Sequence, residues 1–379
     1  MRPAVLVVFV DAMGPAQAPA LLEAGLGLNH VTTVRGVLGY SSGAIPTILT
    51  GAHPEIHGRM CLFSRASDAA SPGPLAPLRW LGLLPRIVHE RERVRRVAGR
   101  VLSRLRGYNG YVALHRVPPV LFGSIDIPEK EDLFQARRIG TATTFLQHAR
   151  EAGLRVVATD WKLPEAKRVE QIEALPDADL AFLYLSGMDA ILHRDGDMST
   201  DARSWCLDAA GWIDRARRAL SRSGREVRTL VVGDHGMARV TSVVDPRPAT
   251  VRLRRVLRDG FLFVDATMLR IGGRHDELYE ARKILRELPG TLLDAEGLAA
   301  RNAPANGTYG DLIHVLPEGA LFVPSFVGGH VHGMHGYDRG TSSTEAAVLS
   351  DVPVNHRLHG LEDIAPSVLE SLEIPRGRR

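Results

Sequence analysis

Four short apolar runs, each followed by polar or glycine residues, constrain most what this chain can fold into. They are Val5–Val10, Arg155–Ala158, Leu180–Leu185 and Thr229–Val232, and helical-looking sequence separates each run from the next. Runs of this length are typical of strands that are buried on both faces of a parallel sheet. The sequence therefore predicts an α/β fold in which a mostly parallel central sheet is flanked by helices.

Acidic side chains follow three of these four runs. Asp11 comes after the first run, Asp189 after the third and Asp234 after the fourth. Because ligands of open α/β sheets bind at the carboxyl ends of the strands, we expect the three carboxylates to lie at one edge of the sheet, beside a site.

The segment GYSSGAIPTILTGAHPEIHG, residues 39–58, predicts a serine at the start of a helix. Ser41 and Ser42 follow an extended β-branched run, and Pro46 indicates a first helical turn. A serine there can cap free N–H groups, while the positive helix end favours an anionic oxygen or a bound phosphate. The pair is therefore either the cap of a core helix or a source of a hydroxyl nucleophile.

Aspartate and histidine recur in two further segments. Asp189 and His193 are four residues apart in SGMDAILHRDG, so on a helix they would share one face, where they could bind one metal ion or form a surface contact. In VVGDHGM, Gly233 and Gly236 bracket Asp234-His235 and permit a turn that would bring both side chains to one ion or cap a loop.

A histidine cluster follows late in the chain, in GGHVHGMHGYDRG. His330, His332 and His335 alternate with glycines, a pattern that core packing does not explain and that favours metal binding. Carboxylate and imidazole ligands without thiolates suit zinc, with manganese as the alternative. Two such divalent ions about 4 Å apart would lower the pKa of a serine hydroxyl and hold phosphate oxygens.

Composition changes between Arg59 and Glu131, where Arg86–Arg106 is dense in arginine and carries apolar residues at helical spacing. This stretch predicts an amphipathic helix that packs on the core or makes a peripheral contact with a membrane surface. No aromatic interleaving or nucleic-acid motif accompanies it, which argues against nucleic acid as a partner. We expect a core of residues 1–58, 132–240 and 328–379, a basic cap at 59–131 and a second cap at 241–327.

Local patterns predict further elements outside the four runs. Helices are expected at Phe134–Glu151, Asp201–Ser221 and Glu277–Glu287, and strands at Thr250–Leu253 and Phe261–Val264.

Cysteine content and the N-terminus bear on the compartment. Cys61 and Cys206 are the chain's two cysteines, which rules out a disulfide framework. The apolar run Ala4–Val10 ends at Asp11 without a small-residue cleavage site, so it predicts a buried strand and not a signal peptide. No apolar run is long enough to span a bilayer. We therefore expect a cytoplasmic protein.

Taken in order, these motifs resemble the alkaline phosphatase superfamily, and most closely its type I phosphodiesterase/nucleotide pyrophosphatase branch. The resemblance rests on VVFVDAMG, SSGAIPTILTGAHPEIHG, GMDAILHRDG, VVGDHGM and HGMHGYD, and LEDIAPSVLESLEIP resembles the closing helix of the family. It implies an alkaline phosphatase-like core with two zinc ions. The implied ligands are Asp11, Asp234 and His235 for one ion and Asp189, His193 and His335 for the other.

The resemblance also implies a nucleophile. In this branch it lies nine residues before the threonine of a Thr-Gly pair, which is Thr50 here, so the position falls on Ser41, with Ser42 as the fallback. Attack on phosphorus would form a phosphoserine that water then hydrolyses. His330 and His332 match less closely and are candidates for supporting a metal ligand or facing the substrate.

One departure from the branch affects the choice of substrate. The asparagine that binds a phosphoryl oxygen, about 21 residues after the nucleophile, is replaced here by Leu62. Arg59 lies nearby and could bind phosphate with its guanidinium group, or it is a surface residue after a turn. Without this asparagine, the chain could be a phosphomonoesterase as well as a phosphodiesterase.

The predicted function is metal-dependent hydrolysis of a small phosphoric ester, such as a nucleotide, sugar or lipid phosphate, by a phosphodiesterase/nucleotide pyrophosphatase. The same site could transfer the phosphoryl group, as in a mutase. A sulfatase is disfavoured because no arginine follows Ser41 or Ser42 at the spacing that sulfatases of this superfamily use. The alternative that is not an enzyme is a degenerate member that only binds a phosphorylated ligand or a membrane surface.

Overall fold

The computed structural model describes residues 2–66, 75, 78, 83, 91–222, 224–353 and 358–374. The chain forms two compact units. The first comprises Met1–Gly58, Phe134–Arg239 and Val331–Arg379, and the second comprises Arg59–Leu133 and Val240–His330. Both segments expected as separate caps, 59–131 and 241–327, fall in the second unit. Their division into two caps stays a prediction.

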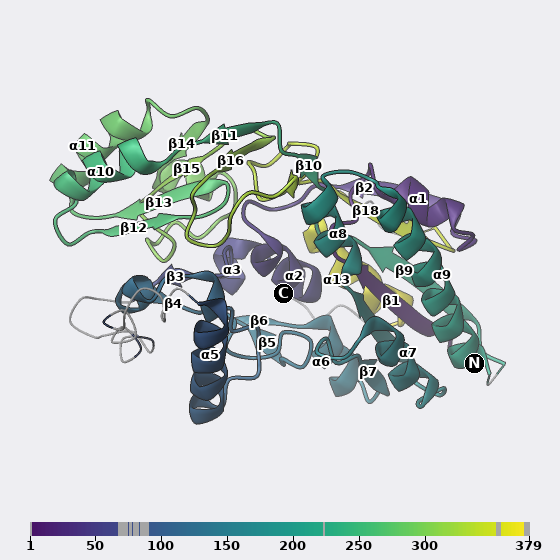
Figure 1. Ribbon diagram of the computed structural model, residues 1–379. Coiled ribbons are helices and arrows are strands. Elements are labelled where there is room, and N and C mark those ends of the chain that lie inside the picture. The colour runs from purple at the N-terminus through teal and green to yellow at the C-terminus, as the bar shows by residue number, and fades with distance from the viewer. Residues whose placement is uncertain are drawn as a thin grey trace. The chain divides into compact units, whose positions relative to one another are not determined.

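A mixed six-stranded sheet forms the centre of the first unit (Figure 1). The strands run in the order β2 (His30–Val34), β18 (Ala346–Ser350), β9 (Val227–Val232), β1 (Ala4–Val10), β8 (Leu180–Leu185) and β7 (Val156–Ala158). β1 pairs in parallel with both β8 and β9, and β7 pairs in parallel with β8. β18 is antiparallel to β9 and to β2. The four predicted strands are thus four adjacent parallel strands, and the predicted fold class is confirmed.

Helices cover both faces of this sheet, which explains why all of β1 is buried. Alternate side chains of a strand point to opposite faces. Leu6 and Val8 pack in one cluster with residues of four helices, whereas Phe9 points the other way and stacks on Tyr184, with ring centroids 5.3 Å apart. The first face carries α1 (Ala18–Glu23), α7 (Glu165–Glu173), α8 (Gly187–Asp195) and α9 (Thr200–Ser221). The second carries α6 (Phe145–Glu151) and α13 (Ile364–Ser371), with α2 (Ser41–Thr50) packed against them.

The helix predicted at Phe134–Glu151 is shorter than expected. Only α6, from Phe145, is helical, and a hairpin of β5 (Arg138–Ile139) and β6 (Ala142–Thr143) precedes it. Gly140 lies between these strands with a φ of 58°, which favours a turn. The Thr144 hydroxyl then accepts a hydrogen bond from the Gln147 N–H and caps the helix. The prediction was wrong because it followed the apolar pattern past these two signals.

The strand predicted at Thr250–Leu253 is also wrong, because these residues lie in α10 (Arg247–Val256). Ala249 and Leu253 are buried four residues apart, as one face of a helix requires. Burial of that face outweighs the strand preference of β-branched residues. The helices expected at Asp201–Ser221 and Glu277–Glu287 and the strand at Phe261–Val264 are confirmed by α9, by α11 (His275–Leu285) and by β12 (Phe261–Val264).

The second unit contains a four-stranded antiparallel sheet. Inside it the fully buried Arg270 donates to the Phe63 carbonyl oxygen at 2.8 Å and to Asp265 at 3.1 Å, and its guanidinium group lies over the ring of Phe263. Arg270 thereby joins the two chain segments that form the unit. The sheet order is β12, β13 (Met268–Gly272), β15 (Leu312–Val315) and β14 (Thr291–Leu293).

The remaining elements of this unit are shorter, apart from α5 (Glu92–Arg106). α5 confirms the helix expected in Arg86–Arg106 from Glu92 onwards, and residues 86–90 lie outside the described residues. Within the described ranges, no helix has the length and apolar character needed to cross a bilayer. The other elements are β3 (Ser64–Arg65), η2 (Leu114–Arg116), η3 (Pro119–Gly123), β4 (Ile125–Asp126), β11 (Ser242–Val244), α12 (Ala295–Ala299) and β16 (Ala320–Phe322).

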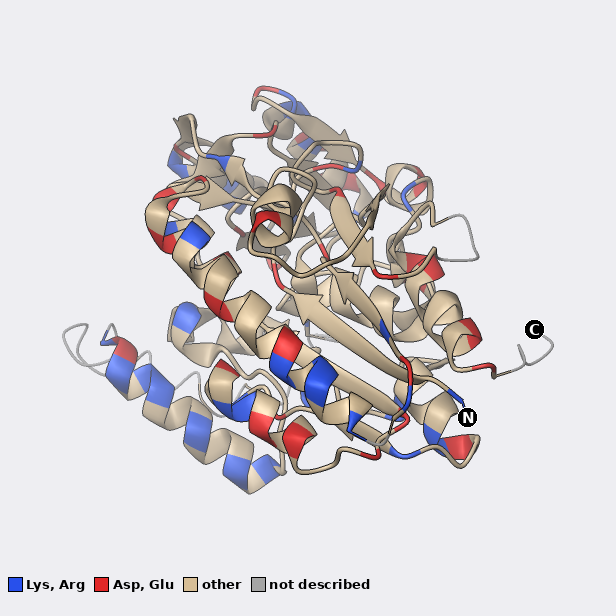
Figure 2. Cartoon of the chain, turned by 90° about the vertical axis from the view of Figure 1, so that its right-hand side faces the viewer, with Lys and Arg blue, Asp and Glu red and all other residues tan. Residues whose placement is uncertain are grey.

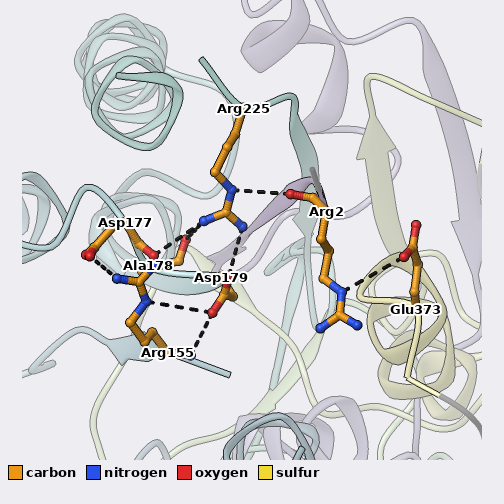
Figure 3. Close-up of polar contacts among 7 residues, drawn as sticks. All are labelled: Arg2, Arg155, Asp177, Ala178, Asp179, Arg225 and Glu373. Atoms are coloured by element: carbon orange, nitrogen blue, oxygen red, sulfur yellow. Dashed lines mark hydrogen bonds and ion pairs between the residues drawn. The ribbon is translucent and has the colours of Figure 1, made fainter. Parts of the chain in front are cut away.

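Charged side chains join the strands of the central sheet at their amino ends (Figure 3). Asp179 precedes β8, accepts a hydrogen bond from the Arg155 N–H at 2.9 Å and pairs with Arg225 at 2.9 Å. Arg225 also donates to the backbone carbonyl oxygens of Arg2 and Ala178. This end of the sheet is therefore closed by ion pairs, which leaves the carboxyl ends of the strands for a site.

Candidate active site

The loops that follow β1 and β9 meet at the carboxyl end of the sheet. Ala12, which follows Asp11, has a φ of 64°, and its N–H donates to Asp234 Oδ1 at 3.1 Å. A Cβ atom on Gly233 would overlap the Met13 carbonyl oxygen. Gly233 does not have the positive φ expected of a residue that permits a turn, and neither does Gly236. Gly233 is needed because the two loops touch there, whereas a Cβ atom on Gly236 would make only ordinary contacts. The positive backbone φ implied by the sequence argument is therefore not what requires a glycine at position 233.

This contact brings three of the predicted ligands into one buried group. Asp11, Asp234 and His235 each offer a ligand atom, and these atoms lie within 4.8 Å of one another. His235 Nε2 is 3.3 Å from Asp234 Oδ2 and 3.6 Å from Asp11 Oδ1. Three ligand atoms at this separation around one point can hold a metal ion.

A second group shares His235 with the first. Ligand atoms of Asp189, His235 and His335 also lie within 4.8 Å of one another. The rings of His235 and His335 are stacked, with centroids 3.6 Å apart. His193 lies beside this group, because its Nε2 atom is 3.3 Å from Asp189 Oδ1 and its ring is 5.2 Å from that of His335. The structure thus gathers all six predicted ligands.

Local structure positions these side chains. Asp189 and His193 occupy one face of α8, and His335 follows β17 (Gly333–Met334), which pairs with β10 (Ala238–Arg239). His193 Nδ1 bonds the Gly333 carbonyl oxygen at 2.8 Å, so α8 and β17 are also joined directly. His235 Nδ1 bonds the Gly236 carbonyl oxygen, also at 2.8 Å. With Nδ1 protonated in both rings, Nε2 carries the lone pair that can bind a metal ion.

Ser41 is the first residue of α2, and Tyr40 before it has extended backbone angles. The Ser41 hydroxyl lies 3.0 Å from His235 Nε2, so the predicted nucleophile touches the histidine that both groups share. The neighbouring Ser42 side chain is buried. Pro46 is the sixth residue of the helix and lies beyond its first turn, contrary to the expected position.

Burial and mutual repulsion dominate the electrostatics of the cluster. Burial, followed by the charges of Asp234 and Asp189, raises the pKa of Asp11 well above its ordinary value. Burial also raises the pKa of Asp234. Burial lowers the pKa of His335, and the neighbouring His235 and His193 lower it further. A cation among these carboxylates would therefore favour their ionised forms.

Several polar atoms of the cluster have no hydrogen-bond partner. They are Asp11 Oδ1, Asp189 Oδ1, Asp234 Oδ2 and His335 Nδ1, and all four are buried. Buried polar atoms without a partner are rare in folded proteins and require an explanation. Three of the four are carboxylate oxygens of the two ligand groups, and bound metal ions would satisfy them. These residues therefore fit the metal site that the sequence predicts.

Three further residues support the cluster and were missed in the sequence. The Tyr184 hydroxyl donates to Asp11 Oδ2 at 2.8 Å, and the ring of Tyr40 packs edge-on against His335. Glu165 accepts hydrogen bonds from the N–H groups of Ser186 and Gly187, at the start of α8. Tyr184 is the one polar side chain in the run LAFLYL, which could have marked it, whereas nothing in the sequence distinguishes Glu165 from an ordinary helix residue.

The predicted substrate-facing residues lie outside both groups. Arg59 and His330 belong to the second unit, and His330 is exposed. His332 belongs to the first unit and is also exposed, and its backbone N–H donates to the His193 carbonyl oxygen at 3.0 Å. His332 thus contributes its main chain to the position of His193. The roles of Arg59, His330 and His332 toward a substrate stay predictions.

Comparisons with known proteins identify a matching family and solved structures of similar fold. The family described as type I phosphodiesterase/nucleotide pyrophosphatase matches residues 130–338. No curated protein matches the chain in sequence.

Among solved structures, murine ectonucleotide pyrophosphatase/phosphodiesterase 5 is similar in fold, with a TM-score of 0.69, 16% identity and coverage of 98% of this chain and 95% of that chain. The human counterpart has a TM-score of 0.68 and 15% identity, covering 100% of this chain and 96% of its own. The inactive murine protein in complex with AMP has a TM-score of 0.67 and 16% identity, and the match covers 99% of this chain and 96% of that chain.

Proposed function

We propose that this chain, which belongs to the type I phosphodiesterase/nucleotide pyrophosphatase family and is a phosphoester hydrolase, cleaves its substrate by attack of the Ser41 hydroxyl. The observation that carries the proposal is the 3.0 Å contact between Ser41 Oγ and His235 Nε2, at the junction of two groups of metal-ligand side chains. A hydroxyl there is next to the groups that would activate it.

The family is metal-dependent, and the donor set favours zinc. Asp11, Asp234 and His235 would hold one ion, and Asp189, His193 and His335 the other, with His235 able to contact both. Oxygen and imidazole nitrogen donors without thiolates suit zinc and also accept manganese. Two divalent ions, when bound, supply positive charge that stabilises phosphoryl oxygens and the ionised form of a hydroxyl.

The chain's own residues orient the reaction. Ser41 stands at the positive end of α2, where the first N–H groups of the helix favour an anionic phosphoryl group. The Ser41 hydroxyl gives up its proton and its oxygen forms a bond to phosphorus, while the bond from phosphorus to the leaving oxygen breaks and the leaving oxygen takes up a proton. Water then cleaves the resulting phosphoserine and returns the hydroxyl. Tyr184 and Glu165 hold Asp11 and the start of α8 in place throughout.

A small nucleotide is the substrate class that we propose. The inactive murine protein of similar fold is in complex with AMP, which supports a nucleoside monophosphate as one part of the substrate. A phosphodiester or a pyrophosphate that contains this part would be cleaved at the phosphorus next to Ser41. Leu62, in place of the asparagine of the branch, favours the phosphomonoesterase as the second candidate.

Hydrolysis of paired substrates tests the proposal. Zinc-loaded protein is incubated with bis-p-nitrophenyl phosphate, p-nitrophenyl phosphate and the p-nitrophenyl ester of thymidine 5′-monophosphate. We expect the nucleotide diester to be the best substrate, and Ser41→Ala to abolish its turnover. Ser42→Ala is the matched control and should keep its activity, because the hydroxyl that contacts His235 is that of Ser41.

Two results would overturn parts of the proposal. Activity that survives Ser41→Ala and is lost in Ser42→Ala would move the nucleophile by one residue. Preference for the monoester would replace the diesterase by a phosphatase. Intact-protein mass spectrometry after an acid quench checks the covalent step, because the phosphoserine must appear in the wild type and be absent from Ser41→Ala.

A further inference from the structure

α5 (Glu92–Arg106) presents two parallel stripes of side chains to solvent. One stripe is apolar and consists of Val97, Val101 and Leu105, with exposed fractions of 57%, 52% and 80%. These residues are four positions apart and therefore lie along one line of the helix. The other stripe is basic, and its members are all exposed: Arg93, Arg96, Arg100 and Arg104.

The opposite side of α5 attaches the helix to its own unit. Gly99 and Leu102 are buried there, and Leu102 belongs to the core cluster that also contains Leu114. Arg95 donates to the Val117 carbonyl oxygen at 3.3 Å. Because α5 packs through this side, the two stripes lie on the exposed side of the helix.

Positive charge on the basic stripe is largely uncompensated. Arg96 forms an ion pair with Glu92 one turn earlier. Across the ranges that the structure describes, no carboxylate forms an ion pair with Arg93, Arg100 or Arg104. Figure 2 shows the resulting concentration of Lys and Arg along this helix, at the lower left of the view. Such a surface attracts a polyanion.

We propose that α5 binds the surface of an anionic lipid bilayer. The arginines would contact lipid phosphates, and the apolar stripe would enter the boundary between headgroups and acyl chains. A helix with a basic face beside apolar side chains binds in this plane because both attractions act together. The proposal concerns a surface separate from the candidate active site and does not rest on the proposed function.

The apolar stripe distinguishes a bilayer from other anionic partners. A nucleic acid would contact the arginines through its phosphates but would gain nothing from Val97, Val101 and Leu105. A protein partner needs more area, since an α-helix of 15 residues is about 22 Å long and about 10 Å wide. One face then covers on the order of 200 Å², whereas a stable interface buries about 800 Å² on each partner.

Vesicle sedimentation tests the proposal on the full chain. Vesicles of pure phosphatidylcholine are compared with vesicles in which about a third of the lipid is phosphatidylglycerol. We expect binding to the anionic vesicles only, and its loss at about 1 M salt, where the Debye length falls to about 3 Å. Ser41→Ala must bind as well as the wild type.

Two triple variants separate the stripes. Arg93→Gln, Arg100→Gln and Arg104→Gln together should weaken binding roughly fivefold per arginine, and on the order of a hundredfold in total. Val97→Gln, Val101→Gln and Leu105→Gln should weaken it at least tenfold without a change in charge, because glutamine keeps the helix and removes the apolar contact.

A matched control removes the same charge elsewhere in the second unit. Arg254, Arg255 and Arg258 lie on or just after α10 and are exposed, like the arginines of α5. Their replacement by glutamine should leave vesicle binding within about twofold of the wild type. Circular dichroism and thermal unfolding verify that every variant is folded.

Three results would overturn the proposal. Absence of binding to anionic vesicles would exclude a bilayer as the partner. An equal loss in the α10 control would attribute binding to net charge and not to α5. Binding that needs the arginines but tolerates glutamine along the apolar stripe would identify a surface for a soluble polyanion, which a labelled single-stranded oligonucleotide would then bind in competition with the vesicles.

Discussion

Neutralising Asp11 should stabilise the metal-free protein and at the same time inactivate it. Asp11 and Asp234 are buried, and their ligand atoms lie within 4.8 Å of each other, with the carboxylate of Asp189 also raising the pKa of Asp11. Without a cation, these charges repel one another inside the protein. Asp11→Asn removes one of the charges with little change of shape.

The size of the effect follows from the geometry. Two unit charges 4.8 Å apart repel each other by about 3.5 kcal/mol at an effective dielectric constant of about 20. Asparagine can still accept the Tyr184 hydrogen bond, although that bond becomes weaker by about 1 kcal/mol once the acceptor is neutral. We therefore expect Asp11→Asn to raise the free energy of unfolding of the metal-free protein by about 2 kcal/mol, or its Tm by about 5 °C.

The pH dependence has a defined sign. The pKa of Asp11 is higher in the folded state than in the unfolded state, so the folded state binds more protons between the two values. The wild type without metal should lose stability as the pH rises from about 3.9 through the raised pKa of Asp11. Below this window the wild type and Asp11→Asn should unfold alike, and the gain of the variant should appear above it.

Thermal unfolding of chelator-treated protein, followed by circular dichroism, measures these differences. Asp179→Asn is the matched control at the amino ends of the strands, where the same substitution removes ion pairs to Arg225 and Arg155 and should lower the Tm. Zinc should raise the Tm of the wild type more than that of Asp11→Asn, in which only the ligand group of Asp189, His193 and His335 is complete. A chelated Asp11→Asn that melts at or below the chelated wild type would refute the reasoning.

Three further substitutions test separate parts of the structure. Tyr184→Phe removes the hydrogen bond to Asp11 and should weaken zinc affinity about 10- to 100-fold in a competition titration with a chelating dye, and unchanged affinity would exclude Tyr184 as a positioning residue. Asp265→Ala leaves Arg270 buried without its ionic partner and should lower the free energy of unfolding by about 3–5 kcal/mol, measured in urea. Replacing both residues by apolar ones should recover most of this loss. An Asp265→Ala variant as stable as the wild type would contradict this expectation. Gly233→Ala should abolish metal binding, because the new Cβ atom would displace the loop that carries Met13 from the loop of Asp234. The measurement is the metal content after dialysis, and full metal content would show that the loops tolerate separation.

Local patterns in the sequence predicted the elements that periodicity and apolar length determine. The apolar runs became β1, β7, β8 and β9. The segment SGMDAILHRDG, considered in the sequence as a possible helix, contains α8. The prediction failed at Phe134–Glu151 and Thr250–Leu253. There a capping threonine and the burial of Ala249 with Leu253 decide the structure, and a residue pattern alone does not contain the packing partner.

The sequence by itself determined which residue types the site could use. Asp11, Asp189 and Asp234 each follow an apolar run, and the histidines stand in short motifs beside glycines, so the chemistry was visible before the fold. Spacing along the chain could relate only near neighbours, such as Asp189 and His193 on one helical face.

Only the tertiary structure decided which of these residues meet. Strand β1 lies between β9 and β8, and this order places Asp11 between Asp234 and Asp189 although the three residues are far apart in the sequence. The fold likewise makes His235 the shared member of both groups and sets Tyr184 against Asp11. The physical reason is that strand order and loop contact are fixed by burial of the whole sheet between its helices, an energy that no short segment carries by itself.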